Sequence, residues 1–175
     1  MKKILAIIFA GAFIMAAQAK AMEMDSSTIE NNVFMASEQA YSECGGMNIS
    51  PDLRWFDVPE EAKSLALIVH DPDAPRDFGW YHWIVVDIPP SVTGVEKGAK
   101  FDAPARELAT DYGVPGYNGP CPPIGHGVHH YHFMLYALDV EELDLTPDMK
   151  PHEIDATVKA SSLAQATITG LYERE

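Results

Sequence analysis

The side chains best suited to chemistry in this chain gather at the ends of three apolar segments. Asp71 and Asp73 follow the first segment, His82 stands early in the second, and the run His129–His132 opens the third. Imidazolium and backbone N–H groups donate hydrogen bonds to anions, and carboxylates orient imidazoles and keep them protonated. If the three ends meet, the sequence predicts a small cavity that binds a small anion and offers carboxylates to an ammonium group.

A loop and several aromatic residues are expected to complete this cavity. The segment 111–128 is rich in glycine and proline and precedes the most aromatic apolar segment, so we interpret it as a binding loop rather than a linker. Its backbone N–H groups are expected to add donors. The aromatic side chains expected to form apolar walls are Trp80, Trp83, Tyr117 and Tyr131.

Strand alternation divides the histidines between two faces. In an extended strand, His129 and Tyr131 point to one side, and His130 and His132 point to the other. Only one set can face the cavity, and we favour His129 with Tyr131. His130 and His132 are then structural or solvated, and His126 in the preceding loop is a weaker candidate.

Each cluster also has a plainer interpretation. Asp-Pro-Asp-Ala-Pro at 71–75 is first of all a turn sequence, because aspartate caps turns and proline fixes φ. A single strand histidine such as His82 is often a partly buried structural residue. The run 129–132 would hold a metal ion only with carboxylate help, since at most two of its histidines share a face. We therefore predict no metal and no cofactor.

The elements that must position these residues are mostly strands. Segments rich in β-branched and aromatic residues, bounded by Pro, Asp or Gly, predict the buried strands of a sheet, and two further segments fit shorter or terminal strands. One helix is predicted over 151–163, because Pro151 suits a first helical position and Glu153 favours a helix N-terminus. The strands are expected over 53–56, 64–70, 81–87, 130–138 and 165–172.

Composition excludes two classes of partner. The 175 residues carry 12 Lys and Arg against 26 Asp and Glu, which gives a formal net charge of −14. Such a surface repels nucleic-acid phosphate and anionic lipid alike. Beyond the N-terminus, no apolar run reaches the roughly 20 residues of a membrane-spanning helix. We therefore predict no nucleic-acid partner and no transmembrane span.

The N-terminus predicts export. Two lysines after the first methionine precede a short apolar stretch that ends in small residues, which is the anatomy of a secretory signal peptide. Cleavage after Ala19 or Ala21 would remove a signal peptide over 1–21 and leave a single domain over 22–175, in the periplasm or secreted. The alternative is a buried N-terminal helix.

The two cysteines agree with an exported protein. Cys44 and Cys121 are the only ones in the sequence, and an oxidising compartment favours their pairing. We predict a disulfide between them, with two buried free thiols as the alternative. Their spacing relative to the histidines is not that of a zinc finger.

Five short motifs occur in a fixed order between residues 30 and 173. They are Asn48-Ile-Ser-Pro51 with Leu53 and Trp55, Asp71-Pro-Asp-Ala-Pro75, Trp80-Tyr-His82-Trp83, Gly119-Pro-Cys-Pro-Pro123, and Gly127-Val-His129-His130-Tyr131. Together they resemble the phosphatidylethanolamine-binding protein family, and in particular exported members of its bacterial YbhB/YbcL branch, the Raf kinase inhibitor-like type. Motifs of this kind are specific for the fold and much less so for an activity.

The resemblance implies a fold and a pocket. The fold is an antiparallel β-sandwich with a large central sheet, a smaller sheet and a peripheral C-terminal helix. The pocket lies at one end of the sheet and binds phosphate-like or carboxylate anions, including the phosphoryl headgroup of phosphatidylethanolamine. Cys121 stands where exported bacterial members often have cysteine, which supports the disulfide. Carried onto this chain, the pocket residues are Asp71, Asp73, Trp80, His82, Gly119, Pro122, His129 and Tyr131.

One position departs from the family pattern. The family usually has arginine directly after the pocket histidine, whereas this chain has His130. An ion pair that supports the pocket is therefore expected to be lost or to depend on pH. Without a nearby arginine, the affinity for bare phosphate is expected to be weak.

These observations favour a non-enzymatic, exported binding protein. Its ligand would be a phosphate- or carboxylate-bearing molecule, such as a phosphoethanolamine-like headgroup, or a phosphorylated partner. The first alternative is an inhibitor that contacts a protease or a kinase. The second is a hydrolase that uses Asp71 and His82 as a general-base pair, although no nucleophile motif accompanies them.

Overall fold

The computed structural model describes residues 20–175. The signal peptide predicted for residues 1–21 lies outside this range, apart from its last two residues. Among residues 20–175, no helix has the length and apolar character needed to cross a membrane.

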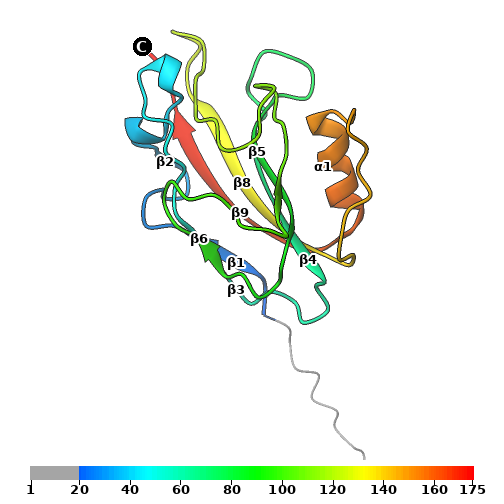
Figure 1. Ribbon diagram of the computed structural model, residues 1–175. Helices are drawn as coiled ribbons and strands as arrows, with labels where there is room; N and C mark the ends of the chain where they lie inside the picture. The colour runs from blue at the N-terminus through cyan, green and yellow to red at the C-terminus, as the bar shows by residue number, and fades with distance from the viewer. Residues whose placement is uncertain (1–19) are drawn as a thin grey trace, which may run out of the picture.

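A large sheet forms the centre of the molecule (Figure 1). Its six strands lie in the order β2-β9-β8-β4-β5-β7, and all neighbours are antiparallel except β2 and β9. The sheet therefore places chain segments far apart in sequence side by side. The strands are β2 (Val33–Phe34), β4 (Ser64–Asp71), β5 (Trp80–Ile88), β7 (Arg106–Glu107), β8 (His129–Leu138) and β9 (Ser162–Tyr172).

A smaller sheet and one helix cover the two faces of the large sheet (Figure 1). The small sheet has the order β1-β3-β6, and the only α-helix among the described residues packs against the other face. Mostly strands, two sheets and one helix confirm the predicted fold class. The bounds are β1 (Glu23–Asp25), β3 (Leu53–Phe56), β6 (Gly94–Val95), α1 (Pro151–Ala160), and the 3-10 turns η1 (Ser37–Gln39) and η2 (Ser42–Cys44).

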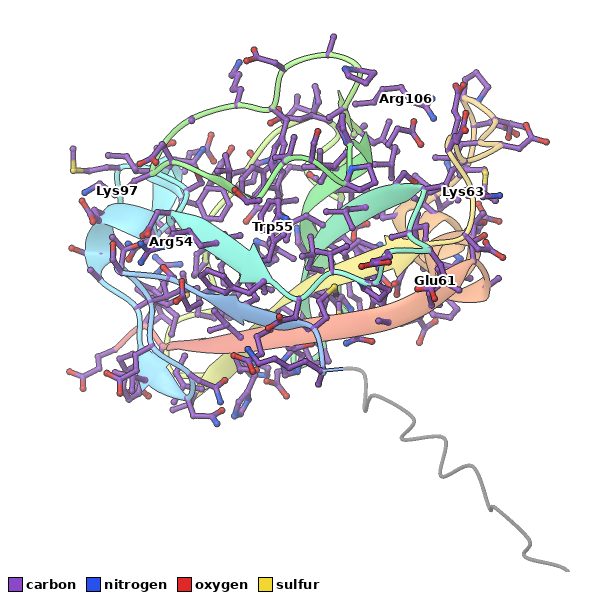
Figure 2. The ribbon with its side chains drawn as sticks, turned by 90° about the horizontal axis from the view of Figure 1, so that it is seen from below. Arg54, Trp55, Glu61, Lys63, Lys97 and Arg106 are labelled. Atoms are coloured by element: carbon purple, nitrogen blue, oxygen red, sulfur yellow. A yellow bond between two sulfur atoms is a disulfide. The ribbon has the colours of Figure 1, made fainter. Side chains whose placement is uncertain are left out.

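Strand β4 shows why the sheet is apolar on both sides. Leu65, Leu67 and Val69 belong to the core beneath the small sheet, while Ala66 and Ile68 belong to the core beneath α1. A strand buried on both faces shows a continuous apolar run rather than an alternation. Figure 2 shows the interior of the core beneath the small sheet, where the buried Trp55 side chain lies between the sheets.

The predicted strands are found, but two details differ from the prediction. The helix ends at Ala160 rather than at residue 163, because β9 begins at Ser162 and pairs with β8 over its whole length. The strands β1, β2, β6 and β7 were not predicted. Each has only two or three residues, which is too short for a hydrophobic period to be recognised.

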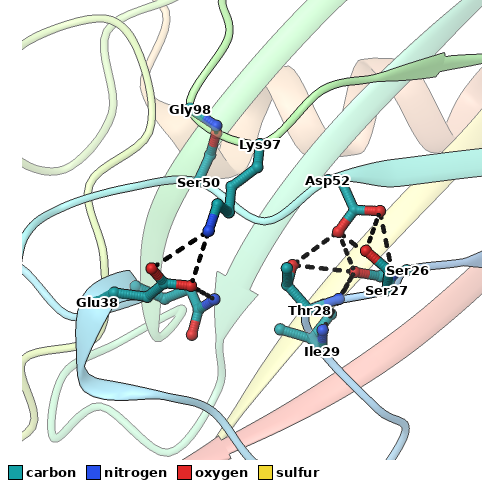
Figure 3. Close-up of polar contacts among 10 residues, drawn as sticks. Ser26, Ser27, Thr28, Ile29, Glu38, Ser50, Asp52, Lys97 and Gly98 are labelled. Carbon is teal, nitrogen blue, oxygen red and sulfur yellow. Dashed lines mark hydrogen bonds and ion pairs between the residues drawn. The ribbon is translucent and has the colours of Figure 1, made fainter.

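The carboxylate of Asp52 attaches the N-terminal segment to the small sheet (Figure 3). It accepts hydrogen bonds from the Ser27 backbone N–H at 3.0 Å, the Thr28 hydroxyl at 2.8 Å and the Ser26 hydroxyl at 3.2 Å. Burial alone would raise the pKa of Asp52, but these donors outweigh it and lower the pKa to about 2. The ionised carboxylate is therefore part of the folded state.

This contact predicts a pH-dependent contribution to stability. Because the folded pKa of Asp52 is depressed, its stabilisation is present above the unfolded value of 3.8 and is lost as the pH falls towards about 2. Asp52→Asn is expected to lower the free energy of unfolding at neutral pH by about 1 kcal/mol, because the site is only partly buried. Urea unfolding curves at about pH 7 and pH 2 measure this difference.

Asp25→Asn is the matched control for this variant. Asp25 pairs with Arg54 across β1 and β3 at 3.3 Å, and both side chains are more than half exposed. Its loss is expected to change stability by only a few tenths of a kcal/mol. If the Asp52 and Asp25 variants unfold at the same urea concentration, the explanation by hydrogen bonds to Asp52 is wrong.

Candidate functional site

A cavity of about 760 Å³ opens at one end of the large sheet. It is lined by Asp71 of β4, Trp80 and His82 of β5, and His129 and Tyr131 of β8. Antiparallel pairing explains this meeting, since the end of β4 lies between the start of β5 and the start of β8. The three polar strand ends predicted from the sequence therefore converge.

A buried Asp71–His129 pair forms one wall of the cavity. The Nδ1 atom of His129 lies 2.7 Å from Oδ2 of Asp71, and both side chains are almost fully buried. The carboxylate accepts the Nδ1–H and so fixes the ring orientation of His129. His82 has no contact with this carboxylate within hydrogen-bond distance, so the Asp71–His82 base pair considered for a hydrolase is not formed.

His82 differs from the prediction that carboxylates keep the cavity histidines protonated. Its Nδ1–H donates to the backbone carbonyl of Asn118 at 2.7 Å, and the ring is 3% exposed. Burial lowers the pKa of His82 to about 4, so the ring is neutral at pH 7. Its Nε2 atom is then a hydrogen-bond acceptor rather than a donor.

Two buried donors at the cavity have no protein partner. Neither the Trp80 indole N–H nor the Tyr131 hydroxyl finds an acceptor among residues 20–175. Burial, and then the neighbouring Asp71 carboxylate, raise the pKa of Tyr131, so its hydroxyl stays protonated. A buried donor without an acceptor is unfavourable by about 1–3 kcal/mol, and a bound acceptor would remove this penalty.

Two arginines contribute to the cavity, contrary to the expectation of none nearby. The guanidinium of Arg76 lies 4.7 Å from the ring centre of Trp80 and 3.5 Å from the Asp111 carboxylate. Arg174 follows β9 and donates to the carbonyl of Pro122 at 3.2 Å. Guanidinium groups are strong phosphate and carboxylate donors, so the absence of arginine no longer supports the expectation of weak phosphate binding, which stays a prediction.

The disulfide joins two loops at the cavity wall. Cys44 and Cys121 are bonded, with their Cα atoms 5.6 Å apart, as the sequence predicted. Both line the cavity, together with Glu43 from η2 and Pro122. The disulfide therefore fixes the distance between η2 and the 111–128 loop.

Some residues predicted at the site lie beside it instead. The Gly119 N–H, expected as a free loop donor, donates to the Asn48 side chain at 2.8 Å, and Gly119 does not line the cavity. Trp83 and Tyr117, which were expected to form apolar walls of the cavity, contact each other within the core beneath the small sheet. Asp73 lies outside the cavity, and its side chain is about half exposed.

His130 keeps a link to Asp73 in place of the arginine of the family pattern. Its Nδ1 atom lies 2.7 Å from Oδ2 of Asp73, and its backbone N–H donates to the same atom at 2.8 Å. Burial would raise the pKa of Asp73, but the bonds from His130 lower it. His132 lies on the same face and contacts Thr169 at 2.9 Å, as strand alternation predicted.

Sequence reasoning missed several residues that line the cavity. Arg76 directly follows the 71–75 turn, and this proximity was a usable signal. Arg174 is distant in sequence and comes close only because β9 pairs with β8. The other missed lining residues that carry polar groups are Tyr41, Glu43, Asp111 and Tyr112. Among residues 20–175, no group of three or more His, Cys, Asp or Glu side chains is arranged to hold a metal ion.

Comparisons with known proteins agree with this architecture. The family model described as phosphatidylethanolamine-binding protein matches residues 25–173. The UPF0098 protein YbcL of Escherichia coli is 38% identical over 165 residues, which covers 90% of each chain. The UPF0098 protein YbhB of the same organism is 38% identical over 132 residues, covering 73% of this chain and 83% of the relative.

Solved structures give the same result. The crystal structure of E. coli YbcL, described as a new member of the mammalian PEBP family, superposes with a TM-score of 0.84 at 35% identity, covering 89% of this chain and all of that one. A carboxypeptidase Y inhibitor, solved with its cognate proteinase, superposes with a TM-score of 0.57 at 18% identity, covering 90% of this chain and 84% of that one. This second likeness shows the fold alone.

Proposed function

Because the chain belongs to the phosphatidylethanolamine-binding protein family, we propose that its cavity binds a phosphate- or carboxylate-bearing ligand without converting it. The ligand class we favour is a phosphoethanolamine-like headgroup, or a phosphorylated group presented by a partner. The residues assigned to it are those of the cavity wall at the ends of β4, β5 and β8.

The observation that carries this proposal is the pair of buried donors that lack acceptors. The Trp80 N–H and the Tyr131 hydroxyl both belong to the wall, and Arg76 and Arg174 add positive charge beside them. An anionic oxygen would satisfy these donors in one step. Each charge-assisted hydrogen bond contributes about 1.5–3 kcal/mol.

The negative groups of the cavity suit a zwitterion. Asp71 is hydrogen-bonded to His129 and Asp111 is paired with Arg76, whereas Glu43 has no ion-pair partner among the described residues. A free carboxylate disfavours a bare anion but attracts an ammonium group. A headgroup with both charges, such as phosphoethanolamine, is therefore favoured over inorganic phosphate.

The disulfide supports export as part of this proposal. A bond between Cys44 and Cys121 persists in an oxidising compartment such as the periplasm or the extracellular space. The proposed ligand would then be met outside the cytoplasm.

Tyr131→Phe tests the cavity directly. This variant removes one of the partnerless donors, and we expect it to weaken phosphoethanolamine binding about tenfold. Two-dimensional NMR titrations of the oxidised protein, residues 22–175, with phosphate, phosphoethanolamine and acetate measure the affinity. In the wild type, the shifts are expected to be confined to residues around the cavity.

Tyr136→Phe is the control. Tyr136 is buried on the same strand, but its hydroxyl contacts the Met134 sulfur in the core beneath α1. Its loss should leave the affinity unchanged. Absence of wild-type shifts at millimolar concentrations of all three ligands would overturn the proposal.

The alternative function is inhibition of a protein partner, such as a protease or a kinase. The observation that favours it is a group of exposed apolar side chains on or beside the 111–128 loop, namely Val114, Ile124 and Val128. Ile124 is 67% exposed, and apolar side chains exposed together on one loop are the kind of surface that contacts a protein partner. If no small ligand binds, this function takes precedence.

A further inference from the structure

The loop before β8 brings His126 onto the cavity histidine. Gly125 and Gly127 on either side of it have φ values of 72° and 92°, a left-handed conformation that glycine adopts without strain. The loop is fixed by a hydrogen bond from the Gly125 N–H to the Arg174 carbonyl at 2.8 Å, and by one from the His126 N–H to the Pro123 carbonyl at 3.1 Å. The sequence Gly-His-Gly therefore folds the His126 imidazole back toward β8.

The result is a continuous chain of three side chains. Nδ1 of His126 lies 2.7 Å from Nε2 of His129, and Nδ1 of His129 lies 2.7 Å from Oδ2 of Asp71. Both ring nitrogens of the buried His129 are therefore occupied by protein groups. His126 itself is exposed, so the chain runs from a buried carboxylate to solvent.

The three hydrogen-bonded side chains have three protonation states. With His129 donating to Asp71, its Nε2 atom is an acceptor, so a neutral His126 must donate from Nδ1 and leaves a bare Nε2 toward solvent. One added proton is shared between the two facing nitrogens, and the outer nitrogen of His126 then carries a hydrogen. A second added proton would set two N–H groups against each other and break the contact.

The singly protonated state is the favoured one for an anion. A hydrogen bond within a charged pair is about twice as strong as a neutral one, so the His126–His129 contact is strongest when the pair holds one added proton. The positive charge then lies on a pair of rings whose centres are 5.0 Å apart, and one of these rings lines the cavity. An anion in the cavity is attracted to this charge.

We propose that His126 is a positioning residue of the anion cavity, which by sharing one proton with His129 couples anion capture to the uptake of that proton. The inference rests on the proposed function and concerns the regulation of the same site. His126 acts through His129 rather than by contact with the ligand, since of these two histidines only His129 lines the cavity. Anion affinity then rises as the pH falls through the range in which the pair takes up its proton.

Other charged and titratable groups face the pair from every neighbouring element. On the β4 side these are Asp71 and Asp73, and on β8 it is Tyr131; His130 lies on the opposite face of β8 and is bonded to Asp73. Neutral His82 faces the same cavity from β5. From β9 and the segment after it come Tyr172, which is paired in register with His129, and Arg174. Of these, the exposed His130 needs its own control in a pH titration.

The test uses sulfate, a tetrahedral anion that does not itself titrate near neutral pH. Calorimetry of the wild type between about pH 8 and pH 5 is expected to show binding that tightens by up to about tenfold per pH unit on the alkaline side of proton uptake and levels off on the acid side. In His126→Phe the whole profile is expected to move to lower pH. In the range where the wild type gains affinity, the variant is expected to bind about five- to tenfold more weakly, because a charged hydrogen bond is about twice as strong as a neutral one. The two profiles should converge at the acid end.

Three further variants separate this role from a structural one. His126→Gln offers an amide oxygen to the His129 N–H and should restore part of the shift. His132→Phe changes a histidine on the opposite face of β8, and His130→Gln removes the exposed histidine next to His129 in sequence. Both variants should retain the wild-type midpoint of the pH dependence of sulfate binding. In nitrogen-detected NMR of the wild type without ligand, His126 is expected to carry its hydrogen on Nδ1 at high pH.

The outcomes distinguish the two proposals. If the wild type binds sulfate at the cavity and the His126→Phe profile coincides with it, or is weaker by the same factor at every pH, the inference about His126 is overturned and the binding function stands. If phosphoethanolamine binds the wild type but its affinity does not change with pH, only the inference about His126 is overturned. If sulfate, phosphate, phosphoethanolamine and acetate all fail to bind at any pH, the proposed function fails and this inference fails with it.

Discussion

Replacing both cavity arginines, with Arg76→Gln and Arg174→Gln together, is expected to weaken phosphoethanolamine binding about 30- to 100-fold. Each guanidinium lies at the cavity wall, and each already has one protein acceptor, Asp111 or the Pro122 carbonyl. A bound anion therefore shares these donors with the protein acceptors. Each guanidinium then contributes somewhat less than the full value of about 1.5–3 kcal/mol for a charge-assisted hydrogen bond. NMR or calorimetric titration measures the ratio.

The matched control for the arginine variant changes the net charge equally but at a distance. Arg54→Gln with Lys63→Gln removes two cations from the small sheet and from the start of β4, at the opposite end of that strand from Asp71 (Figure 2). If the loss of affinity came from net charge, both double variants would bind equally weakly, and added salt would remove the difference from the wild type. Equal affinities for the two double variants would contradict the assignment of the arginines to the site.

The main strands could be predicted because they carry strong local signals, whereas the two-sheet arrangement was implied by the family resemblance. β4 is a continuous run of apolar residues, and the start of β8 alternates between buried and more exposed residues, so that His129 and Tyr131 were separated correctly from His130 and His132. The two-residue strands could not be predicted in this way. They exist because longer strands offer an edge to pair with, which is a tertiary effect.

The candidate site was predictable only where its residues end long strands. Asp71, His82 and His129 all stand at or near such ends, and the sheet brings them together. Arg174 enters the cavity through the register of β9 on β8, and His126 through two glycines with positive φ. Neither relation leaves a spacing or a period in the sequence, so Arg174 was missed and His126 was only a weaker candidate.

The protonation states were the least predictable part of the site. The sequence places His82 near two carboxylates, which favours the charged form, yet its ring meets the Asn118 carbonyl and is buried. Burial dominates, and the pKa falls to about 4. This leaves the cavity with an acceptor at His82 and donors at Trp80 and Tyr131, an arrangement that matches a ligand with both an ammonium and a phosphoryl group.

Removal of the disulfide is expected to destabilise the fold and weaken ligand binding together. Cys44→Ala with Cys121→Ala removes a bond between residues 77 positions apart, for which a loss of about 2–4 kcal/mol in the free energy of unfolding is typical. Both cysteines line the cavity, so the distance between η2 and the 111–128 loop is no longer fixed. Urea unfolding and a phosphoethanolamine titration of the same sample measure the two effects.

A thiol reductant provides the control for the disulfide variant. It should bring the wild type to the unfolding midpoint of the double alanine variant and leave that variant unchanged, because the bond is the only difference being tested. Mass spectrometry after alkylation of the exported protein should find no free thiol. Two alkylated cysteines, or equal unfolding midpoints of the wild type and the double alanine variant before reduction, would show that packing alone holds the cavity wall. The disulfide would then no longer support export.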